Sequence, residues 1–320
     1  MKLRKPAPLL PGDTLAVVAP GSPPTDAERL MAGIGRLEAL GFRVEVGRSA
    51  RKRRGYLAGT DAERAEDLNA FLRRPDVKAL VCVRGGYGAL RILPHLDYEA
   101  ARRHPKLLVG YSDVTALHLA FLAKAGWPGL SGPMAAVEWG DLDAASERLF
   151  LDLARGAVPS PLLGPSGETL RPMRPGTAEG PLIGGNLAVL TRLLGAPFLP
   201  SLRGAILFLE EVGEAPYRID GMFAHLRLTG HLDALGGLIL GGFTECEPSP
   251  GRPSLSLDAV FDDYLHDAPF PVARGLVYGH FPVKNTMPVG IRARLSVDDE
   301  TAEVSLLEPV VAEAQSRPPV

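Results

Sequence analysis

The chain has 320 residues, of which 35 are basic and 37 acidic, so its formal net charge is −2 at pH 7. This balance argues against a nucleic acid or an anionic membrane surface as a partner of the whole chain. Two cysteines cannot form a disulfide framework, and no apolar run reaches the roughly 18 residues of a membrane-spanning helix. We therefore expect a soluble, cytoplasmic protein with no membrane partner, long enough for two modest domains.

The first half of the chain alternates between apolar runs and segments with helical spacing. Strands are expected at residues 15–19, 42–46, 79–83 and 107–109, and helices at 26–40, 61–72 and after Ser112. The run at 79–83 is apolar on both faces, as the central strands of a parallel sheet are. The alternation predicts an α/β domain in which helices cover both faces of a parallel sheet. Ligands bind beyond the carboxyl ends of such strands.

The second half mixes strands and helices less regularly. Helices are expected at 187–194, 217–229 and 258–265, and strands at 205–209, 238–243, 272–277, 292–297 and 302–307. Between the halves, a predicted helix at 143–155 precedes a stretch rich in proline and glycine. The predicted organisation is an N-terminal domain at 1–155, a linker at 156–180 and a C-terminal domain of mixed α/β character at 181–320.

Ser112 lies where a predicted strand meets a predicted helix. A sharp turn at that place presents a serine hydroxyl to a base, and the next backbone N–H can face a developing oxyanion. Ser112 is therefore a candidate nucleophile, although a serine at a helix start is often an N-cap. Val114 stands where a G-x-S-x-G turn would have its second glycine. Asp113 would lie in the first helical turn, where a carboxylate complements the helix dipole.

His280 and Glu210 are candidates for the remaining catalytic groups. Each follows an apolar strand, and His280 is flanked by a glycine and a turn-rich segment, where functional residues tend to lie. A carboxylate near an imidazole can fix its tautomer and stabilise the imidazolium. Glu211 and Glu214 follow the same strand, and local sequence does not choose among the three carboxylates.

The loop at residues 85–88 contains three glycines, which let backbone N–H groups approach a ligand. It lacks both the Lys-Ser/Thr of a P-loop and the G-x-G-x-x-G spacing, so an oxyanion hole is favoured over nucleotide binding. No Cys, His, Asp or Glu residues have zinc-ligand spacing, and we expect no metal and no cofactor.

Several motifs in order along the chain resemble the L,D-carboxypeptidase family of serine peptidases. This family includes muropeptide L,D-carboxypeptidases and the microcin C self-immunity peptidases. The matching motifs are Arg84-Gly85-Gly86-Tyr87-Gly88, Gly110-Tyr111-Ser112-Asp113, Leu209-Glu210-Glu211, Pro216-Tyr217-Arg218-Ile219-Asp220 and Gly279-His280. The match runs nearly end to end, from Pro11 to the last strands.

The resemblance implies a Rossmann-like N-terminal domain, a mixed α/β C-terminal domain and an active site in the cleft between them. It implies Ser112 as nucleophile, His280 as general base and Glu210 as the residue that orients the histidine. The backbone N–H groups of Gly86 and Asp113 would form the oxyanion hole. The implied activity is release of the terminal D-alanine from muropeptide tetrapeptides in cell-wall recycling, and the implied assembly is a homodimer.

A carboxypeptidase must also recognise the free carboxylate of its substrate. Candidates for that contact are Arg84, Arg218 and Lys284, and Gly85 and Tyr87 are further candidates for contacting substrate. The chain departs from the family pattern at two positions: Gly221 stands where an arginine is expected, and Ser131 where histidine is frequent.

Two alternatives stay open from the sequence. One is a peptidase of the same mechanism that acts on aminoacyl- or peptidyl-nucleotide conjugates, as the microcin-immunity branch does. An aromatic residue that stacks on a nucleobase would favour it, and Trp139 is the candidate. The other is a non-catalytic, two-lobed protein that binds muropeptides.

Overall fold

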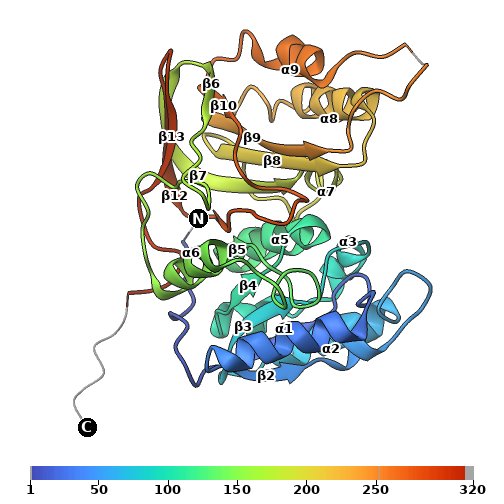
Figure 1. Ribbon diagram of the computed structural model, residues 1–320. Coiled ribbons are helices and arrows are strands. Elements are labelled where there is room, and N and C mark those ends of the chain that lie inside the picture. The colour runs from blue at the N-terminus through green and yellow to red at the C-terminus, as the bar shows by residue number, and fades with distance from the viewer. Residues whose placement is uncertain (1, 252, 314–320) are drawn as a thin grey trace.

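Two β-sheets, one in each half of the chain, organise the fold that the computed structural model describes for residues 2–251 and 253–313 (Figure 1). The first sheet has the strand order β11-β5-β4-β3-β1-β2 and the second β13-β12-β7-β8-β9-β10-β6. The strands are β1 (Thr14–Val18), β2 (Arg43–Val46), β3 (Val77–Cys82), β4 (Leu107–Val109), β5 (Gly129–Ser131), β6 (Arg171–Arg174), β7 (Gly176–Asn186), β8 (Ile206–Val212), β9 (Gly237–Thr244), β10 (Val272–Arg274), β11 (Met287–Val289), β12 (Arg292–Val297) and β13 (Ala302–Leu306).

Helices pack around each sheet, and the two resulting α/β domains lie one above the other in Figure 1. The helices are α1 (Ala27–Ala39), α2 (Asp61–Leu72), α3 (Ala89–Ile92), α4 (Tyr98–Arg103), α5 (Thr115–Ala125), α6 (Ala144–Arg155), α7 (Leu187–Thr191), α8 (Pro216–Leu228) and α9 (Leu257–Leu265), with short 3₁₀ turns η1 (Arg48–Arg51), η2 (Leu93–His95) and η3 (Ser112–Val114). No helix in this described part of the chain has the length and apolar character needed to cross a membrane.

The N-terminal sheet confirms the predicted parallel α/β domain. Strands β2, β1, β3, β4 and β5 all run parallel, with β3 between β1 and β4. Residues of β3 and β4 are almost entirely buried, which explains why those runs are apolar on both faces. The loops that follow β1, β3 and β4 therefore meet at one edge of the sheet.

The sixth strand of this sheet comes from far along the chain. β11 pairs antiparallel with β5, with Met287 opposite Ser131 and Val289 opposite Gly129. It is an edge strand, where Pro288 is tolerated because one side of the strand needs no ladder hydrogen bonds. The segment between β10 and β11 is thereby tied to both domains.

The C-terminal sheet is mixed, as predicted, but it begins earlier than expected. The segment 156–180, predicted to be a linker, contributes β6 and the start of β7. β6 is the edge strand next to β10, so Pro172 does not interrupt a central ladder. Glycines in β7 also have a packing reason, because a Cβ at Gly180 would collide with the carbonyl oxygen of Gly204. Residues 314–320 of the predicted C-terminal domain lie outside the described residues.

The two domains meet through α5, which packs against α7 and β7 (Figure 1). At this interface the backbone N–H of Asn186 donates to Thr115 Oγ1 at 3.0 Å. Thr115 begins α5, directly after η3, and Asn186 ends β7. The contact therefore joins the domains beside Ser112.

His118 supports the same region from within α5. Its Nε2–H donates to the carbonyl oxygen of Gly110 at 2.8 Å, and burial lowers the pKa of His118 from 6.5 to about 4. The native state thus binds fewer protons than the unfolded chain between these two values. The contribution of His118 to the free energy of unfolding is therefore fully present above pH 6.5. It is lost as the pH drops towards 4, and the loss amounts to about 3 kcal/mol in total.

A His118→Gln variant tests this expectation, because the glutamine amide can still donate to Gly110 but does not titrate. Urea unfolding of both proteins between pH 4 and 7 should show a steeper loss of unfolding free energy in the wild type. Parallel pH profiles for the two proteins would contradict the assignment. Buried carboxyl groups such as Glu211 titrate in both proteins, so the difference between the two profiles reports on His118 alone.

Candidate active site

Ser112 occupies a strained turn between β4 and α5. Its φ angle is +64°, in the left-handed region that non-glycine residues seldom adopt. Such strain persists only where the surrounding structure enforces it, and it is frequent at functional sites. Ser112 does not cap a helix: the N-cap residues of η3 and α5 are Tyr111 and Val114.

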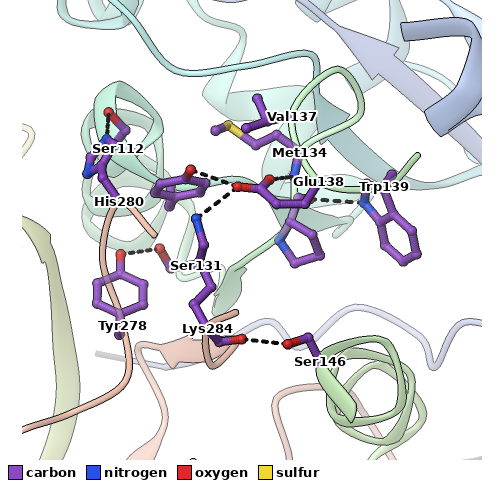
Figure 2. A network of polar contacts seen from close by, with 12 residues as sticks. Ser112, Ser131, Met134, Val137, Glu138, Trp139, Ser146, Tyr278, His280 and Lys284 are labelled. Carbon is purple, nitrogen blue, oxygen red and sulfur yellow. Dashed lines mark hydrogen bonds and ion pairs between the residues drawn. The ribbon is translucent and has the colours of Figure 1, made fainter. Parts of the chain in front are cut away.

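His280 lies opposite Ser112 in the segment between β10 and β11. Its Nε2 is 3.0 Å from Ser112 Oγ, and its Nδ1 is 2.7 Å from Glu210 Oε2. A carboxylate only accepts, so Nδ1 carries the proton and Nε2 is free to accept the serine O–H. Figure 2 shows the Ser112–His280 contact. The structure thus brings together the three residues that the sequence analysis singled out.

Glu210 is the carboxylate among the three candidates that contacts the histidine. It ends the apolar part of β8 and its side chain is fully buried. Glu214 lies beyond the strand, where it pairs with the exposed guanidinium of Arg218 at 3.1 Å. Because burial removes water from Glu210, its interaction with His280 is stronger than it would be at the surface.

Glu211 has a separate structural task. Its two carboxylate oxygens accept hydrogen bonds from Asn186 Nδ2 at 2.9 Å and from the backbone N–H of Ala188 at 2.8 Å. Glu211 therefore satisfies the N-terminus of α7, which begins at Leu187. Burial raises the pKa of Glu211 despite these hydrogen bonds. The neighbouring carboxylates of β8 thus face different partners.

The glycine loop after β3 lies against the nucleophile. A Cβ placed on Gly85 would be 2.8 Å from Ser112 Cβ and 3.0 Å from its Oγ, and Gly86 has a φ of +97°. Asp113 fixes this loop, because its Oδ2 accepts from the backbone N–H of Ala89 at 2.9 Å. Asp113 thus serves the start of α3, and burial raises its pKa. The oxyanion role of the N–H groups of Gly86 and Asp113 stays a prediction.

A Gly85→Ala variant is expected to lose about 10²-fold in kcat, because displacing a reacting group by about 1 Å has an effect of that size. Gly85 does not have a positive φ, so the backbone accepts alanine and the damage comes from the contact with Ser112. Kinetics together with thermal unfolding check this. A fully active variant would show that the loop moves away without displacing the serine.

The predicted substrate-binding side chains lie in different surroundings. Arg84 is partly buried next to Gly86, and Tyr87 is exposed, with its ring 5.5 Å from that of Tyr56 in an edge contact. Arg218 is exposed beside Glu214. Lys284 is instead buried, and its ammonium group lies 2.8 Å from Glu138 Oε1. Glu138 therefore competes with any substrate carboxylate for Lys284.

Trp139, the candidate for stacking on a nucleobase, does not lie at the surface of the cleft. Its side chain is fully buried, its Nε1–H donates to the carbonyl oxygen of Pro133 at 3.0 Å, and its ring packs edge-on against Phe150. Of the two departures from the family pattern, Ser131 hydrogen-bonds Tyr278 at 2.6 Å. Gly221 lies in α8, where an added Cβ would meet open space.

A cavity of about 460 Å³ adjoins His280 and is lined by residues of both domains. Its walls include Tyr111, Glu138 and Lys284, and its rim includes the exposed Arg29. Sequence reasoning missed Glu138 and gave Tyr111 no separate role, because neither stands out by spacing or composition. In residues 2–251 and 253–313, no three His, Cys, Asp or Glu side chains lie close enough to hold a metal ion.

Family models match both domains. The LD-carboxypeptidase N-terminal domain matches residues 15–132, and the LD-carboxypeptidase C-terminal domain matches residues 179–295. The first of these ranges contains Ser112, and the second contains Glu210 and His280.

Individual proteins match over nearly the whole chain. A probable murein peptide carboxypeptidase of Bacillus subtilis (strain 168) is 38% identical over 306 residues, covering 94% of each chain. The microcin C7 self-immunity protein MccF of Escherichia coli is 30% identical, covering 94% of this chain and 95% of its own. The crystal structure of muramoyltetrapeptide carboxypeptidase from Oxalobacter formigenes superposes with a TM-score of 0.80 at 31% identity, covering 92% of this chain and 98% of the other. On these matches and on the fold, the chain belongs to the LD-carboxypeptidase family.

Proposed function

We propose that the protein is a serine-dependent L,D-carboxypeptidase that releases the terminal D-alanine from muropeptide tetrapeptides in cell-wall recycling. The observation that carries this proposal is the line of hydrogen bonds from Ser112 through His280 to Glu210 at the domain interface. The similarity to murein and muramoyltetrapeptide carboxypeptidases supports the substrate class.

The proposed reaction begins with acylation of Ser112. His280 Nε2 takes the hydroxyl proton as Oγ attacks the carbonyl carbon of the L-configured centre of the diamino acid. The tetrahedral intermediate then expels the amine of D-alanine, which takes the proton from the imidazolium. Glu210 stabilises the imidazolium throughout. Water, activated by His280, next attacks the acyl carbon, and Ser112 regains its proton as the shortened peptide leaves.

The negative oxygen of the tetrahedral intermediate needs hydrogen-bond donors. We place it within reach of the backbone N–H groups of Gly86, whose neighbour Gly85 lies against Ser112, and of Asp113, which follows Ser112 in the chain. Donors of this kind contribute roughly 10²–10³ each in rate. The rigid attachment of the loop through Asp113 favours this role, because preformed donors need no rearrangement during the reaction.

The substrate carboxylate requires a cation with an unoccupied side. Arg84, beside the glycine loop, fits this need because a guanidinium can bind a carboxylate with two hydrogen bonds. Arg218, at the exposed start of α8, is the second candidate, but its Nη1 already pairs with Glu214. Gly85 and Tyr87 would contact the substrate backbone and side chains. Lys284 is the third candidate, but its charge is balanced by Glu138.

Two assembly and location proposals follow from family membership and composition. We propose a homodimer, which sedimentation at several concentrations tests directly. We also propose a cytoplasmic location, since both cysteines, Cys82 and Cys246, are free and buried rather than paired.

The similarity to MccF favours a second candidate, hydrolysis of aminoacyl- or peptidyl-nucleotide conjugates. Mass spectrometry of three incubations separates the possibilities: a tetrapeptide ending in L-diamino acid–D-Ala, the same peptide ending in L-Ala, and an aminoacyl sulfamoyl adenosine. Loss of alanine from the first peptide alone supports the L,D-carboxypeptidase. Cleavage of the nucleotide conjugate alone supports the second candidate. Binding without any cleavage would mean that the protein is a non-catalytic muropeptide-binding protein.

A further inference from the structure

We propose that the buried ion pair between Glu138 and Lys284 is a positioning device that holds His280 against Ser112 through the ring of Tyr111. The inference rests on the proposed function, because it assumes that His280 activates Ser112. It assigns a role to Tyr111, Glu138 and Lys284, which are not part of the Ser112–His280–Glu210 hydrogen-bonded series. Figure 2 shows the Glu138–Lys284 ion pair in the same region as Ser112 and His280.

Glu138 is a fixed point of the N-terminal domain. Its Oε2 accepts from the backbone N–H of Met134 at 3.0 Å, within a tight turn. That turn is attached to β3, because the N–H groups of Ala135 and Ala136 donate to the carbonyl oxygens of Cys82 and Val83 at 2.9 Å. The carboxylate is thus anchored to the strand that leads into the glycine loop.

Lys284 belongs to the segment that carries His280, four residues further along. Its side chain is 4% exposed and that of Glu138 is 8% exposed, so little water reaches the pair. The backbone carbonyl of Lys284 also accepts from Ser146 Oγ at 3.1 Å, and Figure 2 shows this contact to α6. Both ends of Lys284 are therefore bound to the N-terminal domain.

Tyr111 lies between the ion pair and the catalytic residues. Its hydroxyl donates to Glu138 Oε1 at 2.8 Å, and the Lys284 ammonium lies 3.9 Å from the centre of its ring. The same ring makes an edge contact with the His280 imidazole, with 5.1 Å between ring centres. Burial and the Glu138 carboxylate raise the pKa of Tyr111, so the phenol stays a donor.

This arrangement has a physical rationale at a domain interface. A buried ion pair contributes little net stability, because desolvation offsets the attraction, but it tolerates few alternative geometries. Here it fixes the segment bearing the histidine to the domain bearing the serine. Tyr111 precedes Ser112 directly, so the same contacts also restrain the strained turn.

The test compares kcat and KM for D-alanine release in Lys284→Met, Lys284→Arg, Glu138→Gln and the double variant Glu138→Gln/Lys284→Met. A second assay follows labelling of Ser112 by diisopropyl fluorophosphate with intact-mass spectrometry, which needs no muropeptide. Arg36→Met is the matched control, because it breaks an ion pair with Glu147, between α1 and α6, and neither residue lines the cavity beside His280. All variants are assayed well below their unfolding temperatures.

We expect Lys284→Met and Glu138→Gln to lower kcat and the labelling rate by about 10- to 100-fold, with KM changing by less than about threefold. Lys284→Arg should recover most of the loss, since a guanidinium can also pair with Glu138. The double variant should stay slow even if its stability returns, and Arg36→Met should keep the wild-type kcat.

Three results overturn the inference. The first is wild-type kcat and labelling in both single variants or in the double variant. The second is a rise in KM alone for Lys284→Met, which would make Lys284 a ligand of the substrate carboxylate. The third is a failure of diisopropyl fluorophosphate to label Ser112 in the wild-type protein. Slower labelling in the variants, in a wild type that labels but releases no D-alanine, would refute the proposed function and support the positioning role.

Discussion

A Ser112→Ala variant is expected to lose at least about 10⁴-fold in kcat for D-alanine release. The hydroxyl supplies the bond to the acyl group, and no other side chain can replace it at the end of β4. Alanine keeps the Cβ against Gly85, so the fold and the unfolding temperature should change little. Single-turnover mass spectrometry of the released amino acid measures the residual rate.

Ser112→Gly is the matched control for this prediction. It is equally inactive, but glycine relieves the strain at a φ of +64°. The relief of about 1–2 kcal/mol exceeds the roughly 0.5–1 kcal/mol of entropy that glycine loses on folding. The glycine variant should therefore be at least as stable as the alanine variant. Substantial turnover in either variant would mean that Ser112 is not the nucleophile.

Glu210→Gln is expected to lower kcat by about 10⁴-fold with little change in shape. The neutral amide no longer stabilises the imidazolium, and its NH₂ group can donate to His280 Nδ1. That bond would place the ring proton on Nε2, where it prevents the imidazole from accepting the serine proton. Steady-state kinetics on the tetrapeptide check the loss in kcat, and far-UV circular dichroism checks the fold.

Glu211→Gln provides the contrast, because Glu211 serves α7 rather than His280. It should lose stability, because both oxygens of Glu211 accept hydrogen bonds and the NH₂ group of glutamine cannot accept, which leaves one buried donor near the start of α7 without its acceptor. Its kcat should stay close to that of the wild type at temperatures where it is folded. If Glu211→Gln were inactive and Glu210→Gln active, the assignment of the two carboxylates would be reversed.

Local sequence signals predicted those elements that begin or end at residues typical of helix caps and turns. Helix α2 spans Asp61–Leu72 as predicted, because Thr60 and Glu63 form a capping box at its start. The candidate site was also predictable in part, since Ser112 and the 85–88 loop follow parallel strands of one sheet, whose carboxyl ends meet at one edge.

Local patterning did not choose between Glu210 and Glu211; the family resemblance implied Glu210, and in the structure its carboxylate contacts His280. Adjacent residues of a strand point to opposite faces, and β8 is buried on both faces, so hydrophobic alternation gave no cue. The contact between Glu138 and Lys284 was equally invisible, because it joins segments 146 positions apart. The three-residue strand β11 is too short for any periodicity.

The late position of β11 has a consequence for how the protein is made. During synthesis on the ribosome, the N-terminal domain emerges before most of the C-terminal domain. The outer edge of β5 then has no partner until β11 has also been made. An exposed edge of this kind can pair with other chains. Ser112 is likewise synthesised long before His280, the proposed general base, which shortly precedes β11. A chain that stops before His280 would therefore lack the proposed general base and could not carry out the proposed reaction.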